Sequence, residues 1–233
     1  ESIASIMKSL LLIGPAISHY IYLIVNQKSE LNKIEFPILI ILSLIGMMLM
    51  VSSNDILSLF VSMELQSLSL YILVSFARED RNSSEAGVKY FVLGSLSTCI
   101  FLFGSSLIYG CLGTTNFSEI ANSINQLNEI PIILVIGVVF ILVALSLKIS
   151  AAPFHMWTPD VYQGAPTIIT AYLSVVPKIA AFAVIIRFLV FPFGEIIIDW
   201  GKIIIILSIT SMLVGSLGAL QQTDIKRLFA YST

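Results

Sequence analysis

Seven apolar stretches, each close to the length of a membrane-crossing helix, limit what this chain can fold into. A helix needs about 20 apolar residues to cross the hydrocarbon core of a bilayer. Inside that core every backbone polar group must be paired within the protein, and the sequence lacks the alternating pattern of barrel strands. We therefore predict an all-α fold, a polytopic transmembrane helical bundle with helices over roughly 3–25, 36–51, 56–76, 88–112, 130–149, 168–191 and 196–220.

Composition supports a membrane protein. Of the 233 residues, 57% are hydrophobic and only 11% are charged, against about 25% charged residues in soluble domains. The net charge of −2 and the absence of a large basic cluster give no reason to expect a nucleic-acid partner. No stretch is typical of a soluble domain, so residues 1–233 are predicted to form a single transmembrane domain surrounded by lipid.

The two cysteines, Cys99 and Cys111, lie in one apolar stretch. Twelve residues of helix would separate them by about 18 Å, which is too far for a disulfide. No metal-ligand spacing accompanies them. We expect neither a disulfide nor a metal site from these residues.

Basic residues predict the orientation of the bundle. In membrane proteins, loops on the cytoplasmic side carry an excess of lysine and arginine. If the helices alternate in direction, Lys8, Arg187 and Lys202 fall on one side, while the other side, predicted to face the cytoplasm or mitochondrial matrix, receives Lys28, Lys33, Arg78, Arg81, Lys89, Lys226 and Arg227.

Three ionisable side chains, Glu64, Lys148 and Lys178, lie deep inside predicted spans. A charged side chain at the centre of a membrane helix costs about 2.5–3.5 kcal/mol on insertion scales, so such residues ordinarily face a partner or a wet cavity. Glu64 could be a proton carrier or a carboxyl that only fixes helix packing. The two lysines could belong to the same proton-transfer site, or could extend their ammonium groups toward the membrane surface.

The stretch after Lys148 predicts a broken helix. Pro153 has no N–H and clashes with the carbonyl four residues earlier, so the helix should unwind and resume as a short piece over 158–166. The open end of the first half presents free carbonyls with a partial negative charge, which favours a nearby ammonium. Irregular backbone at this depth must be covered by protein or water, as at ion sites in transporters.

Other polar groups surround this predicted break. His155 lies just after it, and histidine ordinarily changes charge near neutral pH; it could transfer protons or be a structural histidine. Pro177 should free the carbonyl of Leu173 for water or a hydroxyl, which Ser150, Thr170 or Ser174 could supply. No pattern for dinucleotide, phosphate, haem or iron–sulfur binding is present, so we expect no cofactor in this chain.

The segment "KISAAPFHMWTPDVYQGAPT" (148–167) resembles the antiporter-like membrane subunits of respiratory complex I, the proton-pumping NADH:quinone oxidoreductase, and subunit 2 in particular. Segments "SLFVSMELQSLSLY" (58–71) and "QTDIKRLFAYS" (222–232) are similar to the same family. The resemblance implies that Glu64 and Lys148 form a charge pair that opens and closes, and that Lys178 passes protons onward. His155 is the further candidate for proton transfer.

The same resemblance implies the wider organisation. Residues 36–191 would form a first inverted repeat, 3–25 a flanking helix and 196–233 the start of a second repeat. Either the sequence is a fragment of a longer chain, or a separate chain completes that repeat. Other membrane-arm subunits would be partners, and the subunits of the complex outside this chain would bind NADH, FMN, iron–sulfur clusters and quinone. The chain would then be part of an enzyme, a proton-translocating NADH:ubiquinone reductase, without redox chemistry of its own.

Two other functions remain open from the residues. The chain could belong to an Na⁺/H⁺ antiporter, or it could be a structural spacer that does not pump. An isoleucine-rich composition is typical of an AT-rich genome; it makes the mitochondrial inner membrane the expected location and a bacterial plasma membrane the alternative.

Overall fold

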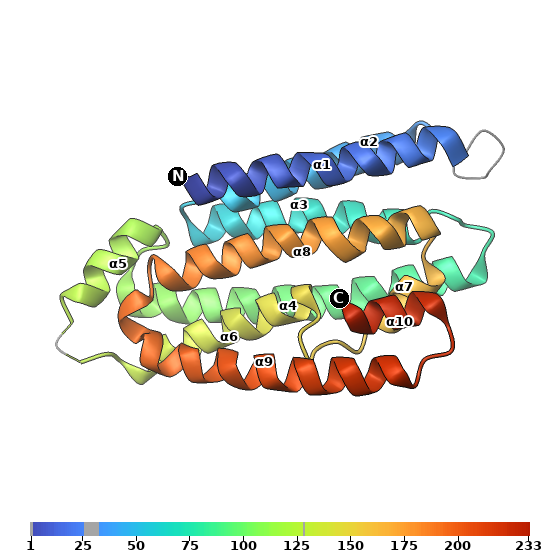
Figure 1. Cartoon of the computed structure of the whole chain (residues 1–233). Helices are drawn as coiled ribbons and strands as arrows, with labels where there is room; N and C mark the ends of the chain where they lie inside the picture. The colour runs from blue at the N-terminus through green and yellow to red at the C-terminus, as the bar shows by residue number, and fades with distance from the viewer. Residues whose placement is uncertain (1, 26–32, 128) are drawn as a thin grey trace.

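The computed structural model describes residues 2–25, 33–127 and 129–233, and shows a bundle of helices that run along one direction (Figure 1). Seven of these helices are long and apolar enough to cross a membrane. The all-α prediction is confirmed, and within the described ranges the β pairing is limited to one isolated bridge between Asp55 and Asn116. The elements are α1 (Ser2–Val25), α2 (Glu35–Ser52), α3 (Ile56–Val74), α4 (Arg81–Leu112), α5 (Phe117–Asn125), α6 (Ile132–Ile149), α7 (Thr158–Gly164), α8 (Thr167–Val190), the 3₁₀ turn η1 (Gly194–Ile196), α9 (Ile197–Leu220) and α10 (Ile225–Ser232).

Glycines let neighbouring helices approach closely. A Cβ atom on Gly46 of α2 would lie 2.7 Å from the backbone nitrogen of Gln66 in α3. A Cβ atom on Gly104 of α4 would lie 2.7 Å from the carbonyl oxygen of Gly137 in α6. Small residues at such crossings bring helix backbones into contact in membrane proteins. These contacts fix α2 against α3 and α4 against α6, so that residues of α3, α4 and α6 can share one polar site.

Two elements differ from the sequence prediction outside the apolar stretches. Helix α4 begins at Arg81, not near 88, because the Asp80 carboxylate accepts a hydrogen bond from the Asn82 N–H at 2.9 Å and caps the helix. The stretch between the predicted spans 88–112 and 130–149, for which no helix was predicted, contains helix α5, which buries Phe117, Ile120 and Ile124. Hydropathy marks the part of a helix that meets lipid, whereas caps and amphipathic spacing mark helices outside it.

The basic residues gather at one end of the bundle. This end, which we call the basic end, contains the connections α3–α4 and α9–α10 and lies at the right of Figure 1. It carries Arg78 in the first connection, Arg81 at the start of α4, and Lys226 and Arg227 in the first turn of α10. Lys28, also predicted on this side, lies outside the described residues. The opposite end contains α5 (Figure 1).

We predict that the two ends are reached from opposite sides of the membrane. After Cys99 and Cys111 are replaced by serine, single cysteines at Glu79→Cys and Gln126→Cys are both at exposed positions. An impermeant maleimide should label Glu79→Cys only from the cytoplasmic or matrix side, because basic loops stay inside, and should label Gln126→Cys only from the other side. Labelling of both cysteines from one side would contradict the topology.

Candidate functional site

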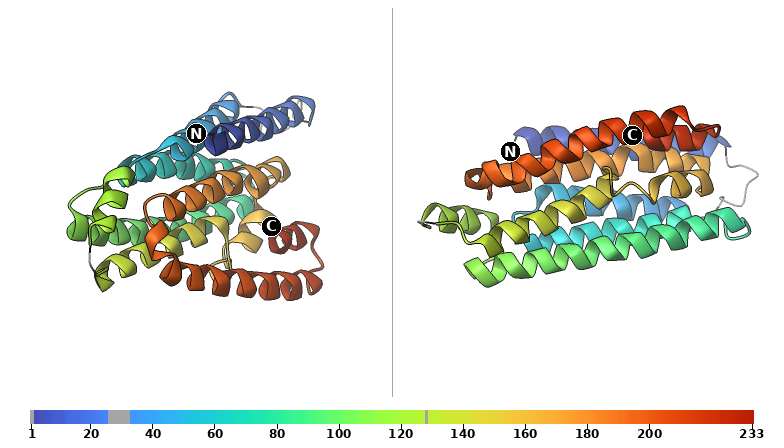
Figure 2. Two further views of the ribbon diagram at one scale, coloured as in Figure 1. Left: turned by 60° about the vertical axis from the view of Figure 1, so that its left-hand side comes forward. Right: turned by 90° about the horizontal axis from the view of Figure 1, so that it is seen from below.

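The break between α6 and α7 forms where the sequence predicts it. Ser150 adopts a left-handed conformation with φ +59°. Its N–H donates to the Leu147 carbonyl at 3.3 Å, and the Ala151 N–H donates to the Ser146 carbonyl at 3.0 Å. This pair of bonds is the Schellman arrangement that ends helices. Pro153 then prevents the helix from continuing, and the short helix α7 resumes at Thr158, further along the bundle (Figure 2).

Side chains from two directions satisfy the backbone of the break. The Trp157 indole N–H donates to the Leu147 carbonyl at 2.9 Å, so a side chain of the break itself pairs a carbonyl at the end of α6. From α9, the Thr210 hydroxyl donates to the Ala152 carbonyl at 2.9 Å, and the Ser211 hydroxyl accepts from the Ala152 N–H at 2.9 Å. Irregular backbone at membrane depth is tolerated when protein pairs it in this way.

Lys148 lies in the last turn of α6 and Glu64 in the middle of α3, and both line one small pocket between α3, α4 and α6. They do not form a direct ion pair. The Lys148 ammonium donates to the Ser67 hydroxyl at 2.7 Å, whereas the Glu64 carboxylate accepts from the Thr98 hydroxyl at 2.7 Å. Both groups therefore line the same pocket, and each is hydrogen-bonded to a hydroxyl group.

Lys178 is buried in α8, one residue after Pro177, with 7% of its surface exposed. Its ammonium donates to the Thr233 hydroxyl at 2.7 Å and lies 5.8 Å from the centre of the Tyr162 ring. The Leu173 carbonyl, which Pro177 cannot pair, accepts from the Tyr162 hydroxyl at 3.3 Å. A hydroxyl was expected at that carbonyl, but Tyr162 supplies it instead of Ser150, Thr170 or Ser174.

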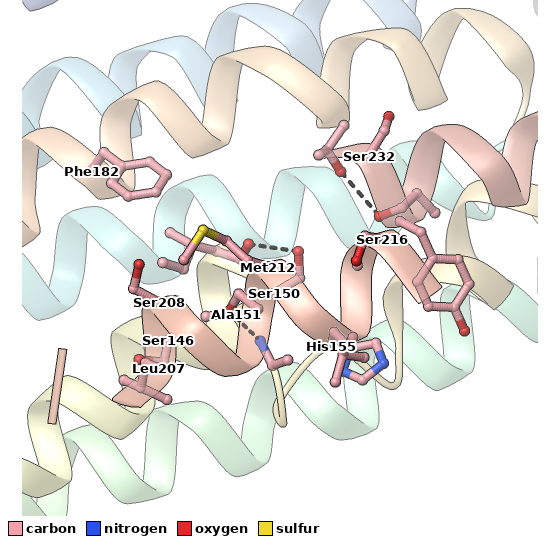
Figure 3. A pocket seen from close by; sticks show the side chains of 18 of the residues that line it. Ser146, Ser150, Ala151, His155, Phe182, Leu207, Ser208, Met212, Ser216 and Ser232 are labelled. Carbon is pink, nitrogen blue, oxygen red and sulfur yellow. Dashed lines mark hydrogen bonds between the residues drawn. The ribbon is translucent and has the colours of Figure 1, made fainter. Parts of the chain in front are cut away.

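A larger cavity of about 670 Å³ adjoins the break and lies between α6, α8, α9 and α10. Figure 3 shows His155 and Ser150 of the break on this cavity, with Ser216 of α9 and Ser232 of α10 around it. Nδ1 of His155 is buried and has no hydrogen-bond partner among the residues that the structure describes. Thr233 also lines the cavity, so the partner of Lys178 and the His155 ring face one space.

Several residues of the site were not found from the sequence. Ser67 lies three residues after Glu64, a spacing that places both on one face of α3, so helical periodicity could have indicated it. Thr98, Thr210 and Ser211 come from other helices, and no local pattern points to them. Trp157 belongs to the segment 148–167, but its bond to Leu147 depends on how the break folds.

Comparisons with known proteins agree with this geometry. Residues 53–233 match the family described as NADH:quinone oxidoreductase/Mrp antiporter, transmembrane. NADH-quinone oxidoreductase subunit N of Maricaulis maris is 46% identical over 233 residues, which cover 100% of this chain and 48% of that protein. The chain spans about half the length of the curated relatives it matches.

Solved structures show the same arrangement of helices. A chain of respiratory complex I from Thermus thermophilus with bound aureothin superposes with a TM-score of 0.83 and 31% identity, over 100% of this chain and 48% of that chain. A chain of the Mrp complex from Dietzia sp. superposes with a TM-score of 0.83 over 98% of this chain and 41% of that chain; at 24% identity it shows the fold alone. The family match extends across the break and across Glu64, Lys148 and Lys178, and the chain belongs to the NADH:quinone oxidoreductase/Mrp antiporter transmembrane family.

Proposed function

We propose that this chain is a proton-translocating part of the membrane arm of an NADH:quinone oxidoreductase, corresponding to subunit N. One observation carries the proposal: the Lys148 ammonium lies at a helix break inside the bundle and shares a pocket with the Glu64 carboxylate. Ionisable groups inside the membrane are costly and ordinarily mark transport paths. Relatives named subunit N, 43–48% identical to this chain, support this finer assignment over the name subunit 2.

The hydroxyl-held state of Glu64 and Lys148 suggests how a proton could be exchanged. A nearby carboxylate favours the charged ammonium, and separation of the two in a poorly hydrated site disfavours it. Glu64 and Lys148 line the same pocket but are not bonded to each other. In this separated state Ser67 accepts a hydrogen bond from Lys148, and Thr98 donates one to Glu64. Movement between a paired and a separated state would bind a proton on Lys148 and release it.

Lys178 and His155 extend this path. Lys178 bonds Thr233, and Thr233 and His155 line the same cavity. Hydroxyl groups from α6, α9 and α10 could hold water in that cavity, and such a chain of polar groups can pass protons. We therefore assign Lys148, the cavity with His155, and Lys178 to successive positions of one proton path.

Quinone reduction elsewhere in the complex would drive this movement. In this proposal NADH, FMN, iron–sulfur clusters and quinone bind to other subunits, and the remaining membrane-arm subunits are the partners of this chain. The relatives named above include bacterial proteins, which supports a bacterial plasma membrane over the mitochondrial inner membrane as the location. The description of the matched family includes the Mrp antiporter, which keeps an Na⁺/H⁺ antiporter subunit as the second candidate function.

We also propose that a further polypeptide segment, in the same or a separate chain, packs against α9. None of the residues of α9 is buried, although Ser208, Ser211 and Ser216 line the cavity. Hydroxyl groups gain little from facing lipid, and the relatives are about twice as long as this chain. A structure of the assembled complex should show protein over this face of α9, and a face covered by lipid alone would contradict the proposal.

We predict that Lys148→Met lowers proton pumping per electron about tenfold or more, because a positioned proton-transfer group contributes roughly 10²–10⁴ in rate. Lys148→Arg keeps the charge but releases its proton too poorly to restore pumping. The double change Glu64→Gln with Lys148→Met should cost less than the two single effects combined, because the groups act as a pair. The measurement is NADH-driven proton uptake by vesicles that contain the assembled complex.

Lys202→Met is the matched control. Lys202 is an exposed lysine on α9 outside the site, so its loss should leave pumping unchanged. Sodium dependence of transport would favour the antiporter function. Normal pumping per electron in an assembled Lys148→Met complex would remove Lys148 from the proton path and favour a structural spacer.

A further inference from the structure

Asp160 joins three helices at the basic end. One of its carboxylate oxygens accepts from the Lys89 ammonium of α4 at 2.8 Å, and the other accepts from the Arg227 guanidinium of α10 at 2.7 Å. Asp160 itself lies in the first turn of α7, directly after the break. Arg227 also donates to the Gln163 side chain at 2.7 Å, and Gln163 donates to Asp224 at 3.0 Å. We call Lys89, Asp160, Gln163 and Arg227 the Asp160 network.

The network is the charged part of a closer contact between these helices. A Cβ atom on Gly164, at the end of α7, would lie 2.5 Å from the carbonyl oxygen of Asn82 in α4. On the other side of α7, the Lys226 ammonium of α10 donates to the Ala165 carbonyl at 2.8 Å. Helix α7 therefore lies between α4 and α10, and Asp160 bonds to both of them.

Helix α10 leads from this network into the proposed proton path. Three residues beyond Arg227, Ala230 is buried, and Tyr231 places its ring 5.9 Å from the His155 ring. Two residues further, Thr233 accepts from the Lys178 ammonium at 2.7 Å. The position of α10 thus decides whether Tyr231 and Thr233 reach His155 and Lys178.

We propose that Asp160 is a positioning residue that fastens α7 and α10 to α4, and so holds Thr233 on Lys178 and Tyr231 beside His155. The inference deepens the proposed function and rests on it. Asp160 touches none of the reacting groups, so it acts through the helices that it joins. Loss of its charge should let α10 move and should separate the cavity from Lys178.

The exposure of the Asp160 network indicates that its ion pairs can break and re-form. The side chains of Lys89, Asp160 and Arg227 keep 36–42% of their surface exposed. Exposed ion pairs of this kind change an equilibrium by about 1.4- to fivefold each. Two such bonds through one carboxylate favour the closed position without making it permanent, as a helix that moves during transport requires.

Glu85 offers a matched control for Asp160. Its carboxylate contacts the same Lys89 ammonium at 2.9 Å, but Lys89 and Glu85 belong to the same helix, one turn apart. Glu85→Gln removes the same unit of charge from the same pocket as Asp160→Asn. Only Asp160→Asn also cuts the bonds between helices, so a difference between the two variants isolates the fastening from the local charge.

The experiment compares Asp160→Asn, Asp160→Glu, Arg227→Gln and Glu85→Gln in the assembled complex, with two readouts. Amide hydrogen exchange of residues 225–232 reports on α10, and proton uptake per electron reports on transport. Asp160→Asn, which removes both ion pairs, should speed exchange by the product of the two, about two- to twenty-five-fold, and should lower proton uptake per electron. Arg227→Gln should act on α10 in the same way, Asp160→Glu should restore part of both signals, and Glu85→Gln should change neither.

Equal exchange in Asp160→Asn and Glu85→Gln would overturn the inference, and so would faster exchange with unchanged pumping. The proposed function fails separately. If Lys148→Met pumps normally, the proton path is wrong, yet the exchange measurement still decides whether Asp160 fastens α10. If Lys148→Met fails to pump while Asp160→Asn behaves as wild type, the path stands and the fastening does not.

Discussion

The cost of an unpaired backbone group in a membrane governs the whole site. A helix that stops inside the bilayer leaves backbone carbonyl and N–H groups without partners. In an aqueous protein water would hydrogen-bond to them, but the bilayer core contains no such water. Here the left-handed Ser150, the Trp157 indole and the Thr210–Ser211 pair of α9 take up those groups. Because three separate contributors are needed, α9 must lie beside the break. The cavity between α6, α8, α9 and α10 follows from that placement.

The end of α6 at the break also stabilises a charged side chain. Lys148 occupies the last turn of α6, where the carbonyl end of a helix favours a cation, and Ser67 completes its surroundings. Glu64, on α3, belongs to a different helix from either lysine. Charges on three helices can change their separation when the helices shift by small amounts, whereas charges on one helix cannot. This arrangement suits a site whose charges must meet and part.

The sequence predicted the long helices and the break well, because both depend on local properties. Apolar length sets each span, and Lys148 followed by Pro153 marks the end of α6. The sequence did not predict which groups pair with the charges. Thr98 reaches Glu64 from 34 positions away, and Thr233 reaches Lys178 from 55 positions away, so these contacts exist only after the helices pack. Hydropathy alone also missed α5, although its Asn116 cap and the helical spacing of Phe117, Ile120 and Ile124 are local signals.

The two short helices show why packing decides so much here. Helix α7 has seven residues and α10 has eight, and helices shorter than about 12–15 residues are marginal by themselves in water. Their positions must come from contacts with longer neighbours: the close approach of Gly164 to α4, and the charged bonds of Asp160 and Lys226. Helix α7 also buries Val161 and Tyr162 in the core, whereas α10 buries only Ala230. A helix with few buried apolar contacts moves at low cost, so α10 is the more mobile of the two. A transport site gains from this design, because the long helices keep the bundle intact while α10 can move Tyr231 and Thr233 toward or away from His155 and Lys178.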